Sequence, residues 1–78
     1  MSSKENASLR VATIRHQLRS GTAREIRERA GISQAEVART LGVHALTVAA
    51  WESGRKAPRF DIALRYADLL DQLATVGQ

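Results

Sequence analysis

The side chains in this sequence whose type and spacing suit chemistry are mainly arginines. Ten of the twelve basic residues are Arg, and the planar guanidinium binds phosphate through two hydrogen bonds at once. Residues 1–60 carry eleven Lys or Arg against five Asp or Glu (+6), whereas residues 61–78 carry one against three (−2). This distribution favours a polyanion as partner, although charge alone fits a merely solvated surface equally well.

The residue types that catalysis and metal binding need are scarce. The two histidines, His16 and His44, are accompanied by no paired carboxylates, no glycine-rich phosphate loop and no metal-ligand spacing. Cysteine is absent, which excludes disulfides, thiolate metal sites and cysteine nucleophiles. We therefore expect no enzyme: no catalytic residue, metal, cofactor or small-molecule substrate.

The length of 78 residues suits one compact domain, because a second core would have too little apolar volume to offset its ordering entropy. Only one Trp, one Tyr and one Phe occur among the 44% hydrophobic residues, so the core must consist mainly of small aliphatic side chains in closely packed helices. With no apolar run of membrane-spanning length and no hydrophobic secretion signal, we expect a cytoplasmic protein. We expect its domain at residues 8–74, with frayed ends at 1–7 and 75–78.

Glycine and proline residues divide the chain into segments of helical length, and no strand pattern is evident. Ser8 is the expected cap of the first helix. Two capping-box pairs, Thr22 with Glu25 and Ser33 with Glu36, open the second and third helices. The pattern predicts five helices, at about residues 8–20, 22–30, 34–41, 44–53 and 61–74.

The stretch from 34 to 53 (QAEVARTLGVHALTVAAWES) fits two helices joined steeply by a tight turn. The crossing needs a small residue, which Ala38 supplies, and the turn needs a residue that accepts positive φ, which Gly42 supplies. Apolar side chains occupy the inward positions. The residues expected to be buried here and in the flanking helices are Val11, Ile14, Leu18, Val37, Leu41, Val43, Val48, Trp51, Ile62, Leu64, Ala67, Leu70 and Leu73.

Several short runs match one known family position by position: Ile26-Arg27, residues 31–38, Leu41-Gly42-Val43, residues 51–55 and Pro58. Through them residues 22–70 resemble the Cro/repressor-type helix-turn-helix family of phage and bacterial regulators. The resemblance implies an all-α, compact five-helix lambda-repressor-like domain, here with an additional N-terminal helix. It also implies a transcriptional regulator that binds double-stranded operator DNA on the nucleoid, with the helix at about 44–53 in the major groove.

The resemblance also assigns roles to particular residues. Arg27 and Glu52 match a family ion pair that links two helices, which we interpret as structural. Residues at positions that the family places against the DNA backbone are expected to contact phosphates. They are Gln34, Thr47, Arg55, Lys56 and Arg59.

The expected base-facing surface departs from the family pattern, because most of its side chains carry only methyl groups. Such side chains contact the thymine methyl but cannot form the bidentate hydrogen bonds that distinguish G or A. At the family's N-cap position, His44 either caps the helix or reads a base. The base-facing residues are His44, Ala45, Leu46, Ala49, Ala50 and Ser53.

The same methyl-rich face suggests an alternative function, that of a protein-interaction module such as an antitoxin or an accessory subunit.

The first helix, basic at Arg10, Arg15 and Arg19, either contacts DNA, packs on the core or mediates dimerisation. A second candidate dimer surface lies near the C-terminus. A homodimer would read a palindromic site with half-sites about 34 Å apart. The C-terminal residues suggested for pairing are Leu69, Leu70, Leu73 and Val76.

Overall fold

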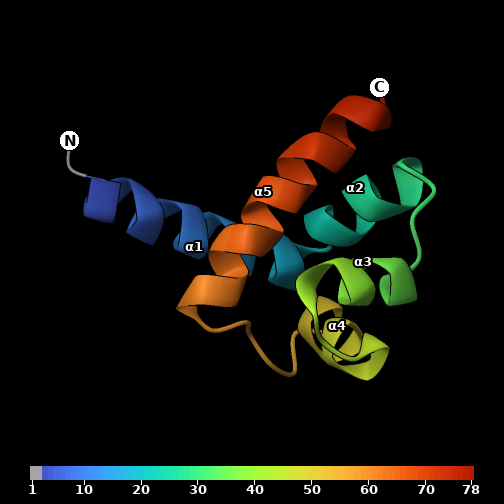
Figure 1. Cartoon of the computed structure of the whole chain (residues 1–78), viewed down its shortest axis with the longest axis horizontal. Helices are drawn as coiled ribbons and strands as arrows, with labels where there is room; N and C mark the ends of the chain where they lie inside the picture. Colours follow the sequence, from blue (N-terminus) through green and yellow to red (C-terminus); the bar gives the residue numbers. More distant parts are fainter. Residues whose placement is uncertain (1–2) are drawn as a thin grey trace.

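This computed structural model describes residues 3–78 of the chain, and this part contains five α-helices and no strand (Figure 1). Side chains are described from Asn6 onward. The predicted all-α fold is confirmed, and the N-terminal helix is the first of five helices rather than a sixth. The helices are α1 (Ser3–Ser20), α2 (Thr22–Arg29), α3 (Gln34–Leu41), α4 (Ala45–Glu52) and α5 (Phe60–Val76).

The two outer helices are longer than the sequence predicts. Helix α1 begins at Ser3, so Ser8 lies inside it and is not its cap. Of the residues expected to fray, Met1 and Ser2 lie outside the described part of the chain, residues 3–7 and 75–76 are helical, and Gly77 and Gln78 lie beyond the last helix. Helix α5 begins at Phe60 and continues to Val76.

The capping box predicted at Thr22 and Glu25 is wrong. Gly21 adopts a left-handed conformation (φ 89°) and is itself the N-cap, so Thr22 is already the first helical residue. The Thr22 hydroxyl instead lies 3.0 Å from that of Ser20. A left-handed glycine thus reverses the chain between α1 and α2 without a side-chain cap.

The second predicted capping box is confirmed at the start of α3. The hydroxyl of Ser33 accepts from the amide of Glu36 at 3.1 Å, and the Glu36 carboxylate accepts from the amide of Ser33 at 3.0 Å. At its other end α3 stops at Gly42 (φ 74°), where the amide of Val43 donates to the carbonyl of Ala38 at 2.9 Å. This closure satisfies carbonyls that the helix end leaves free, and it turns the chain into α4.

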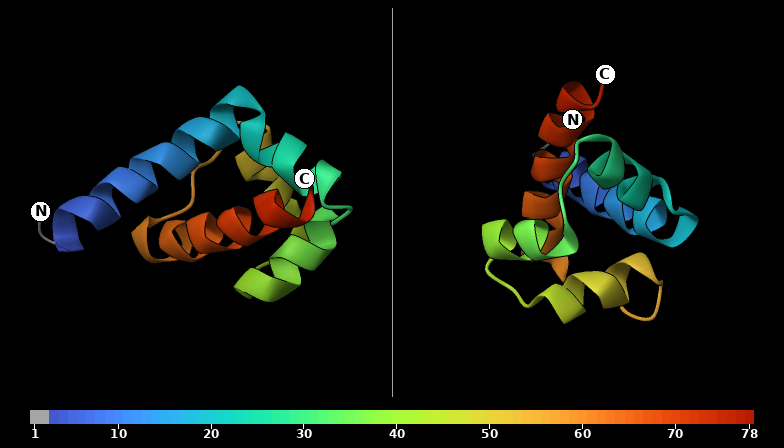
Figure 2. Two further views of the ribbon diagram at one scale, coloured as in Figure 1. Left: turned by 90° about the horizontal axis from the view of Figure 1, so that it is seen from above. Right: turned by 90° about the vertical axis from the view of Figure 1, so that its right-hand side faces the viewer.

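Helix α5 is the central support of the fold, because it packs against α1, α2 and α3. Figure 2 shows α1 and α5 lying side by side, while α3 packs against α5 and α4 packs against α3 and α1. The α5 residues that are buried repeat at helical spacing on one face. They are Ala63, Tyr66, Ala67, Leu70 and Leu73.

The predicted core is largely confirmed, since the apolar residues expected inside α1, α3 and α4 are buried. Two α5 residues differ: Ile62 and Leu64 are only partly buried, while Tyr66 is fully buried. The ring of Tyr66 packs against that of Trp51 with centroids 5.7 Å apart. The two large aromatic side chains therefore form a direct contact between α4 and α5.

Candidate nucleic-acid interface

Helix α4 is held to the rest of the domain by an ion pair between Arg27 and Glu52. The guanidinium donates to the carboxylate through Nε at 2.6 Å and through Nη2 at 2.9 Å, and its Nη1 donates to the carbonyl of Ile32 at 2.9 Å. Both side chains are almost fully buried, with 9% and 3% exposed. The pair joins α2 to α4, as the family resemblance implies.

The carboxylate of Glu52 also accepts a third hydrogen bond, from the amide Nε2 of Gln34 at 2.9 Å. Burial acts to raise the pKa of Glu52, but hydrogen bonds from Arg27 and Gln34 and the nearby positive charge outweigh it and hold that pKa below its ordinary value. The sequence predicts that Gln34 contacts a phosphate. Its side-chain amide has two N–H groups, of which one donates to Glu52 and the other takes no part in this bond. Sequence reasoning missed this bond.

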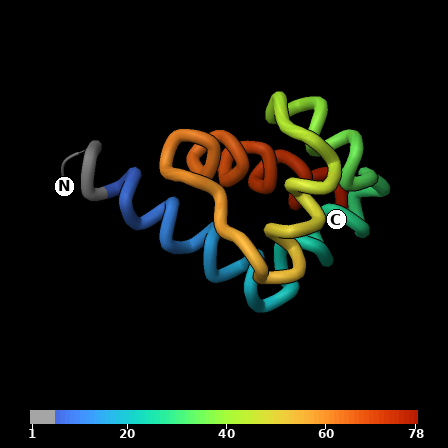
Figure 3. Tube along the Cα trace, turned by 90° about the horizontal axis from the view of Figure 1, so that it is seen from below, coloured from blue at the N-terminus to red at the C-terminus, as the bar shows by residue number. Residues whose placement is uncertain are grey.

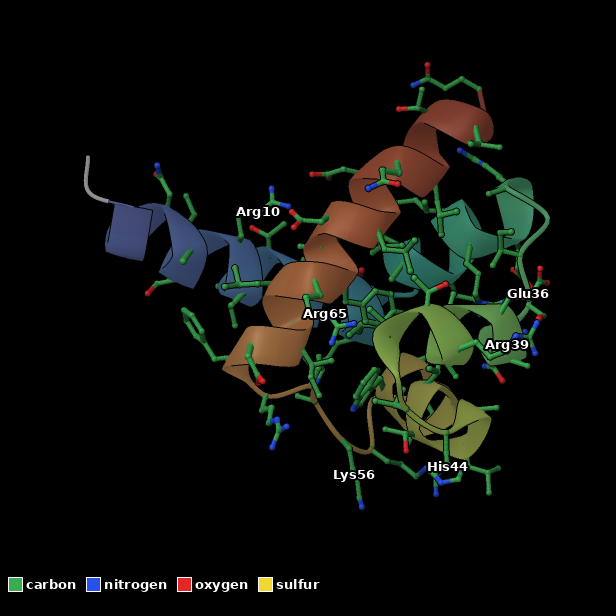
Figure 4. The ribbon with its side chains drawn as sticks, in the orientation of Figure 1. Arg10, Glu36, Arg39, His44, Lys56 and Arg65 are labelled. Carbon is green, nitrogen blue, oxygen red and sulfur yellow. The ribbon has the colours of Figure 1, made fainter. Side chains whose placement is uncertain are left out.

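The outer face of α4 is apolar and open. Ala45 and Leu46 are exposed, Leu46 by 83%, and Ala49 and Thr47 are half-buried. His44 is the N-cap residue by its backbone position, yet its exposed side chain makes no capping hydrogen bond. Figure 4 shows His44 at the edge of the molecule beside α4.

One of the predicted base-facing residues is wrongly assigned, because Ala50 is buried with only 8% of its surface exposed. The segment after α4 folds back, so that the amides of Arg55 and Lys56 donate to the carbonyl of Ala50 at 3.1 and 3.3 Å. The hydroxyl of Ser53 also donates to this carbonyl at 3.0 Å and accepts from Nε of Arg55 at 3.1 Å. Ser53 is exposed, but its hydroxyl is already engaged inside the domain.

The loop between α4 and α5 carries positive charge beside this open face. Residues 53–59 contain Arg55, Lys56 and Arg59 and no acidic residue. In Figure 4 the side chain of Lys56 extends away from the body of the molecule. Arg59 differs from the other two, since it pairs with Asp61 at 3.1 Å.

The only carboxylate on α4 is that of Glu52, which faces inward and is neutralised by Arg27. The outward face of the helix therefore carries no negative charge, and the loop that follows it is cationic. An arrangement of this kind attracts a polyanion without repelling it at short range.

The basic first helix is anchored at two places that its sequence does not reveal. Arg10 pairs with Asp68 at 2.7 Å and with Asp71 at 3.1 Å, both on α5. Arg15 donates through Nε and Nη2 to the carbonyl of Pro58, at 3.1 and 2.9 Å. The sequence left three roles open for α1: DNA contact, packing on the core, or dimerisation. These contacts and the buried residues of α1 establish that it packs on the core.

Two of the four leucine and valine residues suggested for a C-terminal dimer surface are buried in the monomer. Leu70 and Leu73 face the core with 3% and 8% exposed, so they are not available for pairing. Leu69 is partly buried against the core, and Val76 is 68% exposed. The surface is consequently much smaller than the sequence suggests.

None of the helices in residues 3–78 has both the length and the apolar character needed to cross a membrane.

Comparison with known proteins is consistent with this geometry. The family model described as Helix-turn-helix matches residues 24–74, which is more than half of the chain and contains α3, the turn and α4. No curated protein and no solved structure matches the chain. The buried Ala38 of α3 and the turn at Gly42 lie within the matched region. The chain belongs to the helix-turn-helix family of DNA-binding domains, in its Cro/repressor type.

Proposed function

We propose that the protein is a DNA-binding transcriptional regulator that places α4 in the major groove of operator DNA. The observation that carries the proposal is the charge pattern around α4: an outer face free of carboxylates, an inward Glu52 that is already neutralised, and a cationic loop directly after the helix. The major groove is about 12 Å wide and admits one α-helix, while flanking cations bind the backbone.

Base reading in this proposal falls to the N-cap residue and to exposed or half-buried residues at the start and middle of α4. Ala45, Leu46 and Ala49 offer methyl groups that suit the C5 methyl of thymine, and His44 offers a free imidazole. Phosphate contacts fall to Arg55 and Lys56 of the loop, and also to Gln34, Thr47 and Arg59. The small number of polar groups on α4 limits direct readout, so sequence-dependent DNA shape contributes to specificity.

Fluorescence anisotropy of a labelled duplex at several salt concentrations tests the proposal. Wild type should bind with an affinity that falls as salt rises, and Leu46→Glu should abolish binding because it places a carboxylate on the open face of α4, at a side chain that is 83% exposed. The matched control is Thr75→Glu, which adds the same charge near the C-terminal end of α5, opposite α4 in Figures 1 and 2. The proposal fails if wild type shows no salt-dependent binding.

The mode of binding is tested by selecting bound sequences from a random duplex pool. A palindromic consensus supports a homodimer on two half-sites, and a single short motif supports a monomer. In either case the consensus defines the operator with which the variants are compared.

A second candidate function is a protein-interaction module that uses the same face of α4. It is favoured by the 83% exposure of Leu46, a large apolar side chain of a kind that protein interfaces commonly bury. Leu46→Glu separates the two functions. Under this second function the variant keeps DNA binding and loses its protein partner, whereas under the first it loses DNA binding.

A further inference from the structure

A groove of about 260 Å³ lies between the second half of α1 and the segment that follows α4. Figure 3 shows this segment running from α4 past α1 toward the start of α5. The family match begins at residue 24, so α1 lies outside it. The groove therefore lies between a helix outside the matched region and the loop proposed to contact phosphates. Its lining residues are Arg15, Leu18, Arg19, Trp51, Gly54, Arg55, Lys56 and Ala57.

The lining contains four cationic side chains and no carboxylate. Among the side chains of residues 6–78, the ion pairs formed by Arg10, Arg24, Arg27 and Arg59 neutralise those arginines, and none of the pairs includes Arg19 or the other cations of the groove. Four of the seven cationic side chains that form no ion pair in this part of the chain therefore line the groove.

Contacts inside the domain hold this groove in shape. The two hydrogen bonds from Arg15 to the carbonyl of Pro58 fix the loop against α1, and the bond from Arg55 to Ser53 orients that guanidinium. The buried side chains of Leu18 and Trp51 form its apolar part. Arg19 and Lys56 are exposed and take part in no side-chain hydrogen bond among the described residues, so their charged ends are available to a ligand.

We propose that this groove binds a backbone phosphate of the DNA that α4 contacts, with Arg19 of α1 as an additional phosphate ligand beside Arg55 and Lys56. The inference rests on the proposed DNA-binding function. A guanidinium is suited to a phosphate because it forms two parallel hydrogen bonds, and the groove opens next to the C-terminal end of α4. Helix α1 thus extends the DNA contact beyond the matched family domain.

The test compares Arg19→Gln with wild type by anisotropy on a fluorescein-labelled duplex across a series of salt concentrations. If Arg19 neutralises one phosphate, the slope of log K against log salt becomes shallower by about 0.9, with a several-fold loss of affinity at low salt. The matched control is Arg29→Gln, which removes the same charge next to Ala74 and Gly77, at the far end of α5. This control should leave the slope near that of wild type.

Two results overturn the inference while leaving the proposed function intact: an unchanged slope in Arg19→Gln, or an equal change in both variants. If wild type itself does not bind the duplex, the proposed function fails first. Circular dichroism confirms that both variants remain folded, as expected for exposed side chains.

A second arm distinguishes a DNA phosphate from a free one. Trp51 is the only tryptophan and lines the groove, so its fluorescence reports on occupancy. Titration with inorganic phosphate at constant ionic strength should give no saturable change, whereas the labelled duplex should give one that Arg19→Gln weakens. A saturable response to inorganic phosphate alone would assign the groove to a free anion and overturn the proposal.

Discussion

Arg27 on α2 and Glu52 on α4 form a buried ion pair with two hydrogen bonds, of 2.6 and 2.9 Å. The pair makes two further hydrogen bonds: Nη1 of Arg27 donates to the carbonyl of Ile32, and the carboxylate of Glu52 accepts from the side-chain amide of Gln34. The pair fixes the orientation of α4 relative to α2 and α3, and therefore the direction in which the open face of α4 points.

We expect Glu52→Gln to destabilise the domain by about 3–5 kcal/mol, because it leaves the guanidinium of Arg27 buried without a counter-charge. Urea unfolding followed by circular dichroism measures the loss. The control is Glu28→Gln, which breaks the exposed pair of Arg24 and Glu28 (3.4 Å) and should cost only about 0.3–0.5 kcal/mol.

If Glu52→Gln is too unstable to measure, the double variant Arg27→Met, Glu52→Met keeps the prediction testable. It removes both charges and should be more stable than the single variant. Equal losses in Glu52→Gln and Glu28→Gln would contradict the structural role of the buried pair.

The carboxylate of Glu52 should also make the stability of the folded domain depend on pH. The pKa of Glu52 is lower in the folded protein than its ordinary value of 4.5. The contribution of Glu52 to the free energy of unfolding is therefore fully present above pH 4.5, and it is lost as the pH falls through the lowered pKa. The amide and hydroxyl of Ser33 likewise lower the pKa of Glu36, which adds in the same direction.

The free energy of unfolding should therefore decrease as the solution is acidified below about pH 4.5, and Glu52→Gln should flatten this decrease. Urea titrations from neutral into acid pH measure it. Glu36→Gln serves as the comparison and should retain the Glu52 contribution. An acid dependence unaffected by Glu52→Gln would be evidence against the assigned pKa shift.

Tyr66 has a buried hydroxyl with no hydrogen-bond partner among the described residues. Burial also raises the pKa of this group, so it stays protonated. Leaving a polar group unpaired in the core costs about 1–3 kcal/mol, and Phe keeps the ring that packs on Trp51. Tyr66→Phe should consequently be neutral or stabilising in urea unfolding. A clear loss of stability would show that the hydroxyl has a partner in solution.

Replacing thymine by deoxyuridine in a bound duplex tests the proposed methyl readout. Each contacted methyl group should contribute about 0.8 kcal/mol, so wild type should bind the deoxyuridine duplex a few-fold more weakly. Leu46→Ala should reduce this difference, because Leu46 is the largest exposed apolar side chain on α4. Equal binding of both duplexes by wild type would exclude readout through thymine methyls.

The sequence by itself determined the features that depend on neighbours within one or two helical turns. The Ser33–Glu36 capping box, the stop at Gly42 and the buried positions Val37 and Val48 all follow from local spacing, and each is present in the structure. The capping box predicted from Thr22 and Glu25 was wrong because the adjacent Gly21 is the N-cap residue.

Only the tertiary structure decided the contacts between residues far apart in the chain. Arg10 reaches Asp68 across 58 positions and Arg15 reaches Pro58 across 43, and neither pairing leaves a local signal. The burial of Ala50 likewise leaves no local signal, and the segment after α4 folds back to bond its carbonyl. Local spacing fixes which face of a helix is apolar, but the packing of the helices against one another determines which charges are neutralised and which remain unpaired at the surface.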